Sequence, residues 1–121
     1  MIYRHYKGGT YGFLGEALIV SDFEEGAAVI CTGRLSEAAE IQGDDGKVAI
    51  PTGVIVFQGR EGLAVCIPAG LSKAYVAGEK AAIYVALKPG GEVWVRPWAM
   101  WQDEVAGVPR FAPLVPRLRL V

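Results

Sequence analysis

Glycine and proline interrupt this sequence at short intervals along its whole length. The 121 residues include 16 glycines and 7 prolines, and many of them gather in turn-rich clusters such as QGDDG, QGREG and KPGG. Glycine tolerates positive φ, whereas proline fixes φ and lacks a backbone donor, so these clusters end regular structure. Because the segments between them are too short for long helices, the pattern predicts a mainly β fold.

The segments between these clusters are rich in β-branched and aromatic residues, which favour strands. The clearest pair forms a hairpin around Pro89-Gly90-Gly91, where a fixed φ is followed by two residues that tolerate positive φ. In all, we expect nine strands, over Ile2–Tyr6, Phe13–Val20, Ala27–Thr32, Lys47–Ile50, Val54–Gln58, Leu63–Ile67, Ala81–Leu87, Glu92–Arg96 and Arg117–Val121.

Helix signals are confined to two short segments. Leu35–Ile41 contains alanine and glutamate, with Ser36 as a candidate cap. Arg96–Gln102 has Pro97 at a position where a first helical turn accepts proline. Each segment is only a turn or two long, so one or two short helical turns accompany the strands.

The hydrophobic pattern differs between strands. Glu92–Arg96 and Arg117–Leu120 alternate between apolar and polar residues, so each should have one face in solvent. Val54–Phe57 and Ala64–Ile67 are continuously apolar. These two strands are therefore expected either to be buried on both faces or to form an interface between subunits.

The composition is that of a folded, soluble chain. Hydrophobic residues make up 52% and charged residues 21% of the sequence, and no part of it stands out as a second core, so we expect a single domain over 1–121. The formal net charge of -1 lacks the basic excess of a dedicated nucleic-acid binder, so nucleic acid is not a favoured partner. We find neither a signal-peptide pattern nor the ~20 apolar residues of a membrane helix, and therefore expect a cytoplasmic protein with no membrane partner.

Acidic residues are concentrated in the segment 22–46, which has Arg34 as its only base. The simpler interpretation is a solvated surface, and the alternative is an acidic surface that binds a partner or a cation. The seven acids are Asp22, Glu24, Glu25, Glu37, Glu40, Asp44 and Asp45.

The sequence lacks motifs for metals, cofactors and nucleophilic catalysis. His5 is the only histidine, and CxxC, HExxH, GxSxG and phosphate-binding glycine loops do not occur. We therefore expect no metal, no cofactor and no catalytic residue. Cys31 and Cys66 lie in apolar segments, where a cysteine ordinarily packs as a reduced hydrophobe with a raised thiol pKa; a disulfide between them is the alternative.

Three sequence blocks near the two ends of the chain occur in an order that resembles a known family. They are YRHYKG at Tyr3–Gly8 with Leu14-Gly15 and Ala17 after it, WVRP at Trp94–Pro97 with Met100 after it, and VPRF at Val108–Phe111. The pattern is similar to the small bacterial family called domain of unknown function 1653. The resemblance covers residues 1–20 and 79–114 and implies an SH3-like barrel, but it implies no established activity.

The residues from about 21 to 78 form a long central insertion relative to that family pattern. Their apolar strands need cover, so we expect them either to extend the barrel sheets or to form a β layer against them. The expected fold is thus mainly β, an SH3-like small barrel from about 1–20 and 79–121 that is elaborated by a central β insert. Trp98 and Trp101 replace an aliphatic residue and a phenylalanine of the pattern, and we expect them to cover the insert.

Basic and aromatic residues are interleaved within the blocks that carry the resemblance. Guanidinium groups and aromatic faces together suit a carboxylate, a phosphate or a stacked base. The alternative is a structural role, in which the arginines bind loop carbonyls or carboxylates such as Glu16, and the histidine is a satisfied structural residue. The candidate ligand-binding residues are His5, Lys7, Trp94, Arg96 and Arg110.

Three functions remain open at this point. The leading interpretation is a noncatalytic module that binds an anionic small molecule or a peptide-like ligand through these residues. The second is a homo-oligomeric interaction or scaffold protein, in which the continuously apolar strands form an interface. The third, with no motif behind it, is an enzyme that uses His5 as an acid or a base.

Overall fold

Strands make up most of the chain that the computed structural model describes, which comprises residues 1–37, 41–42, 48–49, 52–68 and 71–114. The expected strand Arg117–Val121 lies outside these residues. The elements are β1 (Ile2–His5), β2 (Thr10–Val20), β3 (Ala28–Leu35), β4 (Ile41–Gln42), β5 (Val48–Ala49), β6 (Thr52–Gly59), β7 (Gly62–Cys66), β8 (Lys80–Ala86), β9 (Val93–Pro97), α1 (Trp98–Trp101), β10 (Glu104–Val105), β11 (Val108–Pro109) and β12 (Phe111–Pro113).

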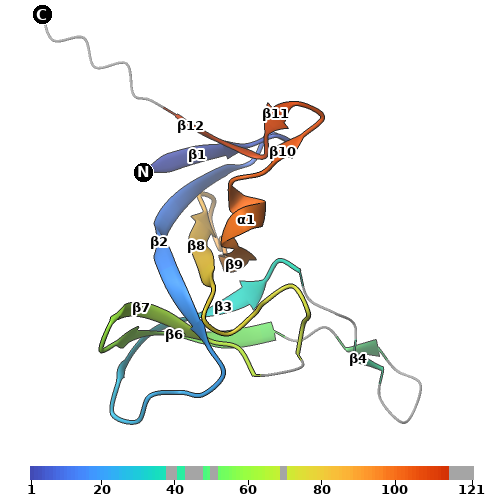
Figure 1. The fold of residues 1–121 in the computed structure, drawn as a ribbon. Coiled ribbons are helices and arrows are strands. Elements are labelled where there is room, and N and C mark those ends of the chain that lie inside the picture. Colours follow the sequence, from blue (N-terminus) through green and yellow to red (C-terminus); the bar gives the residue numbers. More distant parts are fainter. Residues whose placement is uncertain (38–40, 43–47, 50–51, 69–70, 115–121) are drawn as a thin grey trace, which may run out of the picture.

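Six strands close into a small barrel (Figure 1). The order around the barrel is β2-β7-β6-β3-β9-β8, and pairing of β8 with β2 closes the ring. The β2–β7 and β3–β9 pairs are parallel, and the other pairs in the ring are antiparallel. β1 and β12 continue the sheet outward from β2. The prediction of a mainly β small barrel is confirmed.

β2 is long enough to belong to two parts of the molecule. One of its edges pairs first with β1 and then, at Leu18–Val20, with β7, while β8 runs along the other edge. A register shift between Phe13 and Gly15 accompanies a bend of the strand. In Figure 1, β2 curves from the upper part, which contains β1, β12 and α1, to the lower part, which contains β6 and β7. One continuous sheet therefore joins the two parts.

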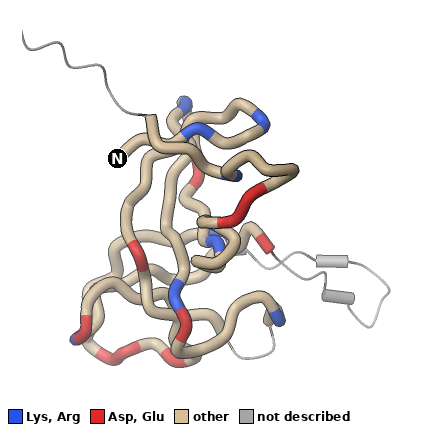
Figure 2. Tube along the Cα trace, turned by 45° about the horizontal axis from the view of Figure 1, so that its top comes forward, with Lys and Arg blue, Asp and Glu red and all other residues tan. Residues whose placement is uncertain are grey.

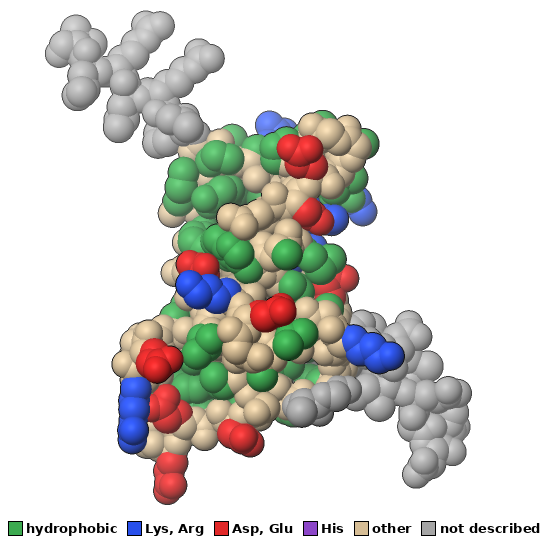
Figure 3. All heavy atoms as spheres, in the orientation of Figure 1, with side chains coloured by type: hydrophobic (Ala, Val, Ile, Leu, Met, Phe, Trp, Pro, Cys, Tyr) green, Lys and Arg blue, Asp and Glu red, His purple; other side chains and the backbone are tan. Residues whose placement is uncertain are grey.

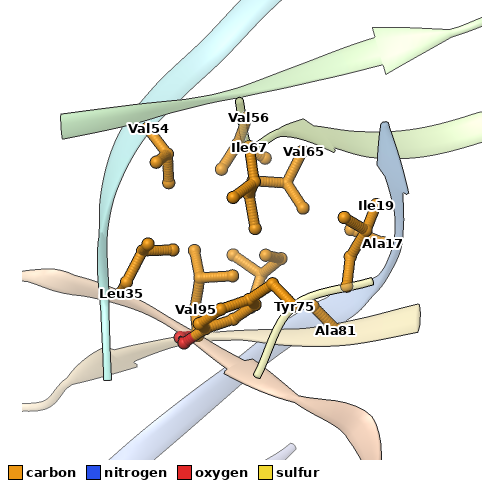
Figure 4. Packing of buried hydrophobic residues seen from close by; sticks show 11 residues of the cluster. Ala17, Ile19, Leu35, Val54, Val56, Val65, Ile67, Tyr75, Ala81 and Val95 are labelled. Carbon is orange, nitrogen blue, oxygen red and sulfur yellow. The ribbon is translucent and has the colours of Figure 1, made fainter. Parts of the chain in front are cut away.

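The barrel interior is filled by one apolar cluster to which every barrel strand contributes (Figure 4). Tyr75, from the segment before β8, packs into the same cluster and is only 7% exposed. Its hydroxyl donates a hydrogen bond of 2.5 Å to the carbonyl of Val95 in β9. The largest fully buried side chains of the cluster are Ile19, Val56, Val65, Ile83 and Val95.

A second core, which is mostly aromatic, lies outside the barrel in the upper part. The Trp101 ring of α1 stacks on Phe111 of β12 with centroids 4.1 Å apart, and it lies 4.9 Å from Tyr84 of β8. Trp98 contacts Phe13 of β2. Both indoles thus cover strands from the two ends of the chain. The expectation that they cover the central segment is wrong, because α1 follows β9 directly and packs on β8 and β9.

The hairpin around Pro89-Gly90-Gly91 is confirmed, since β8 and β9 pair antiparallel throughout. Gly90 has the expected positive φ of 71°. Gly91 is required for a different reason: a Cβ there would collide with the carbonyl group of Ala86. The turn therefore needs one glycine for its backbone conformation and the other for a close backbone approach.

The prediction of a helix over Leu35–Ile41 is wrong for the residues at both of its ends. Leu35 is the last residue of β3, pairs with Val95 and is 4% exposed, whereas Ile41 begins β4. Burial of the Leu35 side chain inside the barrel outweighs the weak helix propensity of so short a segment. The second helix prediction is confirmed over the shorter range Trp98–Trp101.

The central segment 21–78 supplies β3, β6 and β7, which are half of the barrel strands. These strands lie in the ring between β2 and β9, so the central segment completes the barrel and does not simply extend or cover a barrel made by residues 1–20 and 79–121. Val56 and Phe57 are neighbours on β6, and each is 1% exposed. Phe23 covers Phe57 from outside the barrel, with ring centroids 4.9 Å apart. The continuously apolar runs thus reflect burial on both faces of the sheet.

Cys31 and Cys66 are free thiols, and burial raises the pKa of both. Cys31 packs against the barrel interior, whereas the Cys66 thiol donates to the carbonyl of Ser21 over 3.7 Å. No helix in the described part of the chain is long and apolar enough to span a membrane.

Candidate functional site

Side chains from five strands, together with one residue that follows β3, enclose a pocket of about 270 Å³. Three of the five predicted ligand-binding residues, His5, Trp94 and Arg96, line it. They are brought together because β1 pairs with β12, and the Phe111 ring of β12 lies under the guanidinium of Arg96. The lining residues are His5, Tyr11, Ser36, Tyr84, Trp94, Arg96 and Phe111.

Arg96 is the central cation of this pocket. Its side chain is only 12% exposed, and its Nε donates to the Tyr84 hydroxyl over 3.1 Å. Its Nη1 donates to Glu37 Oε1 over 3.2 Å, and the guanidinium carbon lies 5.3 Å from the centre of the Phe111 ring. Within the described residues Nη2 has no acceptor. The guanidinium is thus held in one orientation, with the Nη2 donors unused by the described residues.

Buried groups on the barrel side fix the segment that carries Ser36 and Glu37. The Tyr75 hydroxyl lies 3.4 Å from Ser36 Oγ and accepts the backbone N–H of Glu37 over 3.2 Å. Ser72 Oγ donates to the Glu37 carbonyl over 2.8 Å. Burial is the main cause that raises the pKa of Tyr75, so its hydroxyl stays protonated. These contacts position the carboxylate that in turn orients Arg96.

His5 contributes a neutral imidazole to the pocket wall. Its Nδ1 accepts the backbone N–H of Lys7 over 3.3 Å, which leaves the ring proton on Nε2. Burial lowers the pKa of His5, and the nearby charges of Arg96, Arg110 and Lys7 lower it further. At neutral pH the ring is therefore uncharged and presents Nε2–H as a donor.

Aromatic rings form most of the remaining wall. The Tyr84 ring lies 5.4 Å from Tyr11 and 5.2 Å from Phe111, both edge to face. Tyr84 is 2% exposed, and burial is the largest effect that raises its pKa, so its phenol remains protonated beside Arg96. Trp94 is covered by the guanidinium of Arg34 at 5.5 Å. The pocket thus combines flat apolar walls with a cluster of hydrogen-bond donors.

Lys7 and Arg110, the other two predicted site residues, do not line this pocket. Arg110 forms a two-bonded ion pair with Asp103, at 2.6 and 3.1 Å, which lowers the pKa of that carboxyl. Lys7 lies in the turn after β1, with its Nζ 5.7 Å from the Tyr6 ring. Glu16, considered as an arginine partner, pairs instead with Lys80 at 3.4 Å. The structural alternative therefore describes Arg110 well.

Four lining residues were not among the predicted ligand-binding residues: Tyr11, Ser36, Tyr84 and Phe111, the last of which ends the VPRF block. Tyr84 could have been predicted from the sequence, because the expected hairpin places it opposite Trp94, and residues opposite each other share a face of the sheet. Tyr11 and Ser36 could not have been predicted as pocket residues. Their positions depend on the β1–β2 register and on the parallel pairing of β3 with β9, neither of which leaves a local sequence signal.

The lowered pKa of His5 predicts a pH-dependent stability. In the unfolded chain the imidazole titrates at about pH 6.5, whereas the folded chain binds that proton only at lower pH. Stability from the neutral imidazole is therefore fully present above pH 6.5 and is lost as the pH falls through the folded pKa. Urea unfolding between about pH 5 and 7.5 should show a smaller loss of stability for His5→Gln than for the parent.

Because His5 is the only histidine, few other side chains titrate across this interval. Between about pH 7.5 and 8.5 the difference between the two proteins should stay constant, which serves as the control. An identical pH dependence in parent and variant would contradict the assignment of a neutral, partly buried imidazole.

Some of the acidic residues in the central segment form ion pairs. Glu37 binds Arg96, and Glu24 binds Arg60 over 3.2 Å. Figure 2 shows further acidic positions near one another at the lower end of the molecule. Glu40, Asp44 and Asp45 lie outside the described residues, so the two interpretations of this acidic segment both stay open.

A second hollow of about 350 Å³ lies outside β2 and β7, over Leu18, Phe57 and Ala64. Its one cation, Arg60, has a side chain that is 92% exposed and already pairs with Glu24. Solvent screens such an exposed charge, so it offers little to an anion. The anion-binding candidate is therefore the pocket around Arg96.

Comparison with protein-family models, with curated proteins and with solved structures finds no match for this chain. In the described ranges, no three His, Cys, Asp or Glu side chains gather in a way that could hold a metal ion. The geometry of the pocket itself therefore carries the functional argument.

Proposed function

We propose that the chain is a noncatalytic binding module whose pocket takes a small molecule with a flat body and an anionic group. The observation that carries this proposal is the Arg96 guanidinium in the wall of an aromatic pocket, where its Nη2 donates to none of the described residues. The Nε2–H of His5 supplies a further donor from the wall. The Ser36 hydroxyl donates to Tyr75, whose own proton goes to the Val95 carbonyl. A carboxylate or phosphate on a planar scaffold matches both features.

The size of the pocket supports a small ligand. At about 270 Å³ it lies just below the 300–1,000 Å³ range of pockets for drug-sized molecules. Glu37 already neutralises one edge of the guanidinium, so the site has little surplus positive charge. A singly charged ligand therefore suits it better than a polyphosphate or a nucleic-acid backbone, whose binding needs many cations.

The protonation state of His5 supports binding over catalysis. A general base needs an unprotonated nitrogen directed at substrate, whereas Nδ1 of His5 is engaged by the backbone of Lys7. Nε2 carries the ring proton and acts as a donor. The imidazole is therefore suited to recognise an acceptor group on a ligand.

We also propose membership of the domain of unknown function 1653 family. The supporting observation is spatial, because the three blocks that carry the resemblance meet at the pocket. His5 of the first block pairs with Phe111 of the third, and Arg96 of the second packs on the same ring.

The test compares binding of benzoate, phenyl phosphate, benzamide and benzylamine to the parent and to Arg96→Met by isothermal titration. The two anions should bind the parent, and the variant should bind them at least about tenfold more weakly, because the charge-assisted donor edge is lost. Benzamide and benzylamine should bind poorly to both. Arg60→Met, which removes an exposed arginine, is the matched control and should leave binding unchanged.

Arg96→Lys keeps the positive charge but lacks the planar fork, and it provides a second variant should Arg96→Met fold poorly. It should also weaken anion binding. Equal affinity for the anions in the parent and in both Arg96 variants would contradict the proposal.

A further inference from the structure

The charges around the pocket are nearly balanced, and Glu37 is the residue that balances Arg96. Among the described residues that line the pocket, Arg96 is the only charged one at neutral pH, because the imidazole of His5 is neutral there. Lys7 lies on the exposed turn after β1 and does not line the pocket, so solvent screens its charge. The other arginines nearby are bound by carboxylates, in the pairs Arg34–Glu92 at 2.7 Å and Arg110–Asp103 at 2.6 Å.

The Arg96–Glu37 ion pair is more enclosed than the ion pairs on the outer surface. Figure 3 shows charged side chains of opposite sign beside one another at several places on the face it presents. The Arg60 side chain that binds Glu24 is 92% exposed, whereas the Arg96 side chain is 12% exposed. Solvent screens charges less in the enclosed position, so the Glu37 carboxylate acts strongly on an anion that reaches Arg96.

The backbone of Glu37 is held at two points by buried side chains. The Tyr75 hydroxyl accepts its N–H over 3.2 Å, and Ser72 Oγ donates to its carbonyl over 2.8 Å. Ser72 is 8% exposed and its Oγ also accepts the N–H of Ala74 over 3.3 Å, which fixes the serine side chain. None of these contacts uses the Glu37 carboxylate. A substitution of the Glu37 side chain therefore leaves the backbone of this segment anchored.

The pocket offers an anion a single positive charge, and Glu37 already opposes that charge at 3.2 Å from Arg96 Nη1. A carboxylate ligand brings one negative charge. A phosphate monoester carries a charge close to -2 at pH 8, because its second pKa is about 6. The second negative charge would be repelled by Glu37 and would find no second cation among the described lining residues, so its removal from water would not be compensated.

We propose that Glu37 is the specificity-determining residue of the pocket, and that it selects planar molecules with one carboxylate over dianionic phosphate monoesters. This inference rests on the binding function proposed above and narrows its ligand class. Glu37 orients the guanidinium through Nη1 and opposes a second negative charge on the ligand. Glutamine in its place keeps an oxygen that can accept from Nη1 but carries no charge, so Glu37→Gln separates the two roles.

Isothermal titration of the parent and of Glu37→Gln with benzoate and phenyl phosphate at pH 8 tests this selectivity. The parent should bind benzoate at least about tenfold more tightly than phenyl phosphate. Because the Coulomb energy scales with the ligand charge, Glu37→Gln should raise the logarithm of the phenyl phosphate affinity about twice as much as that of benzoate. This difference should shrink as added NaCl screens the charges. A purely structural role of Glu37 would instead weaken the binding of both anions by a similar factor.

Glu24→Gln is the matched control, because Glu24 also binds an arginine at 3.2 Å and its side chain is 34% exposed, like that of Glu37. It should leave both affinities unchanged. Glu37→Ala keeps the backbone contacts and should shift the selectivity in the same direction as Glu37→Gln. Equal affinity of the parent for the two anions, or an equal change for both in the Glu37 variants, overturns the selectivity but leaves the binding function standing. A parent that binds neither anion overturns both.

Discussion

Replacement of Trp101 by alanine should lower the free energy of unfolding by about 3–5 kcal/mol, the range for a large buried aromatic side chain. Trp101 is 5% exposed and touches rings from three strands besides the stacked Phe111. Removal of the indole leaves a cavity between α1, β8 and β12, which the surrounding rings can fill only in part. Chemical denaturation measures this loss directly.

Trp98→Ala is the matched control, since Trp98 lies in the same helix, is partly exposed and contacts Phe13 at the longer centroid distance of 6.0 Å. Its loss should be clearly smaller than that of Trp101→Ala. Trp101→Phe keeps one stacked ring and should be intermediate. Equal losses for Trp98→Ala and Trp101→Ala would contradict the assignment of Trp101 as the centre of the aromatic core.

The second large effect is expected for Tyr75→Phe, at about 2–3 kcal/mol of stability. The hydroxyl donates to the Val95 carbonyl over 2.5 Å and accepts the backbone N–H of Glu37 over 3.2 Å. Phenylalanine fills the same space but leaves the Glu37 N–H without its partner, and the Val95 carbonyl keeps only the bond from the Ser36 N–H. Because the hydroxyl also positions Ser36 and Glu37, the variant should bind anionic ligands more weakly.

Tyr6→Phe is the control for this substitution, because Tyr6 is 40% exposed and the change at an exposed site should stay within about 0.5 kcal/mol. Unfolding by urea and titration with benzoate test both parts of the prediction. If Tyr75→Phe matched Tyr6→Phe in both measurements, Tyr75 would not connect the barrel core to the pocket.

Local patterns in the sequence were sufficient for most of the strands. The β8–β9 hairpin follows from Pro89-Gly90-Gly91 and its flanking β-branched runs, and double burial of Val56 and Phe57 follows from the continuous apolar run. Short elements without such runs were missed. β10, β11 and β12 lie in the last third of the described chain, where Val108–Pro109 and Phe111–Pro113 contain proline, which weakens the strand signal.

The closure of the barrel could not be predicted from the sequence. It depends on two parallel pairs, β2–β7 and β3–β9, between segments that are distant in the chain. The β3–β9 pair also shapes the site, because it brings Ser36 beside Arg96, whereas Arg110 is bound by Asp103 and does not line the pocket. Residue type and strand period therefore identified His5, Trp94 and Arg96, whereas the positions of Tyr11 and Ser36 required the fold.

The measurement that tests the proposed pocket most directly is an NMR titration of the full chain with benzoate, followed at Arg96 Nε–H and at the Trp94 indole N–H. Binding at the pocket predicts saturable shifts of both resonances with one dissociation constant, and their loss in Arg96→Lys. The chemical shifts of resonances around Leu18 and Phe57, which line the hollow of about 350 Å³ outside β2 and β7, should not change. Saturable binding that moves the Leu18 and Phe57 resonances but neither Arg96 nor Trp94, or no binding at all, would contradict the account.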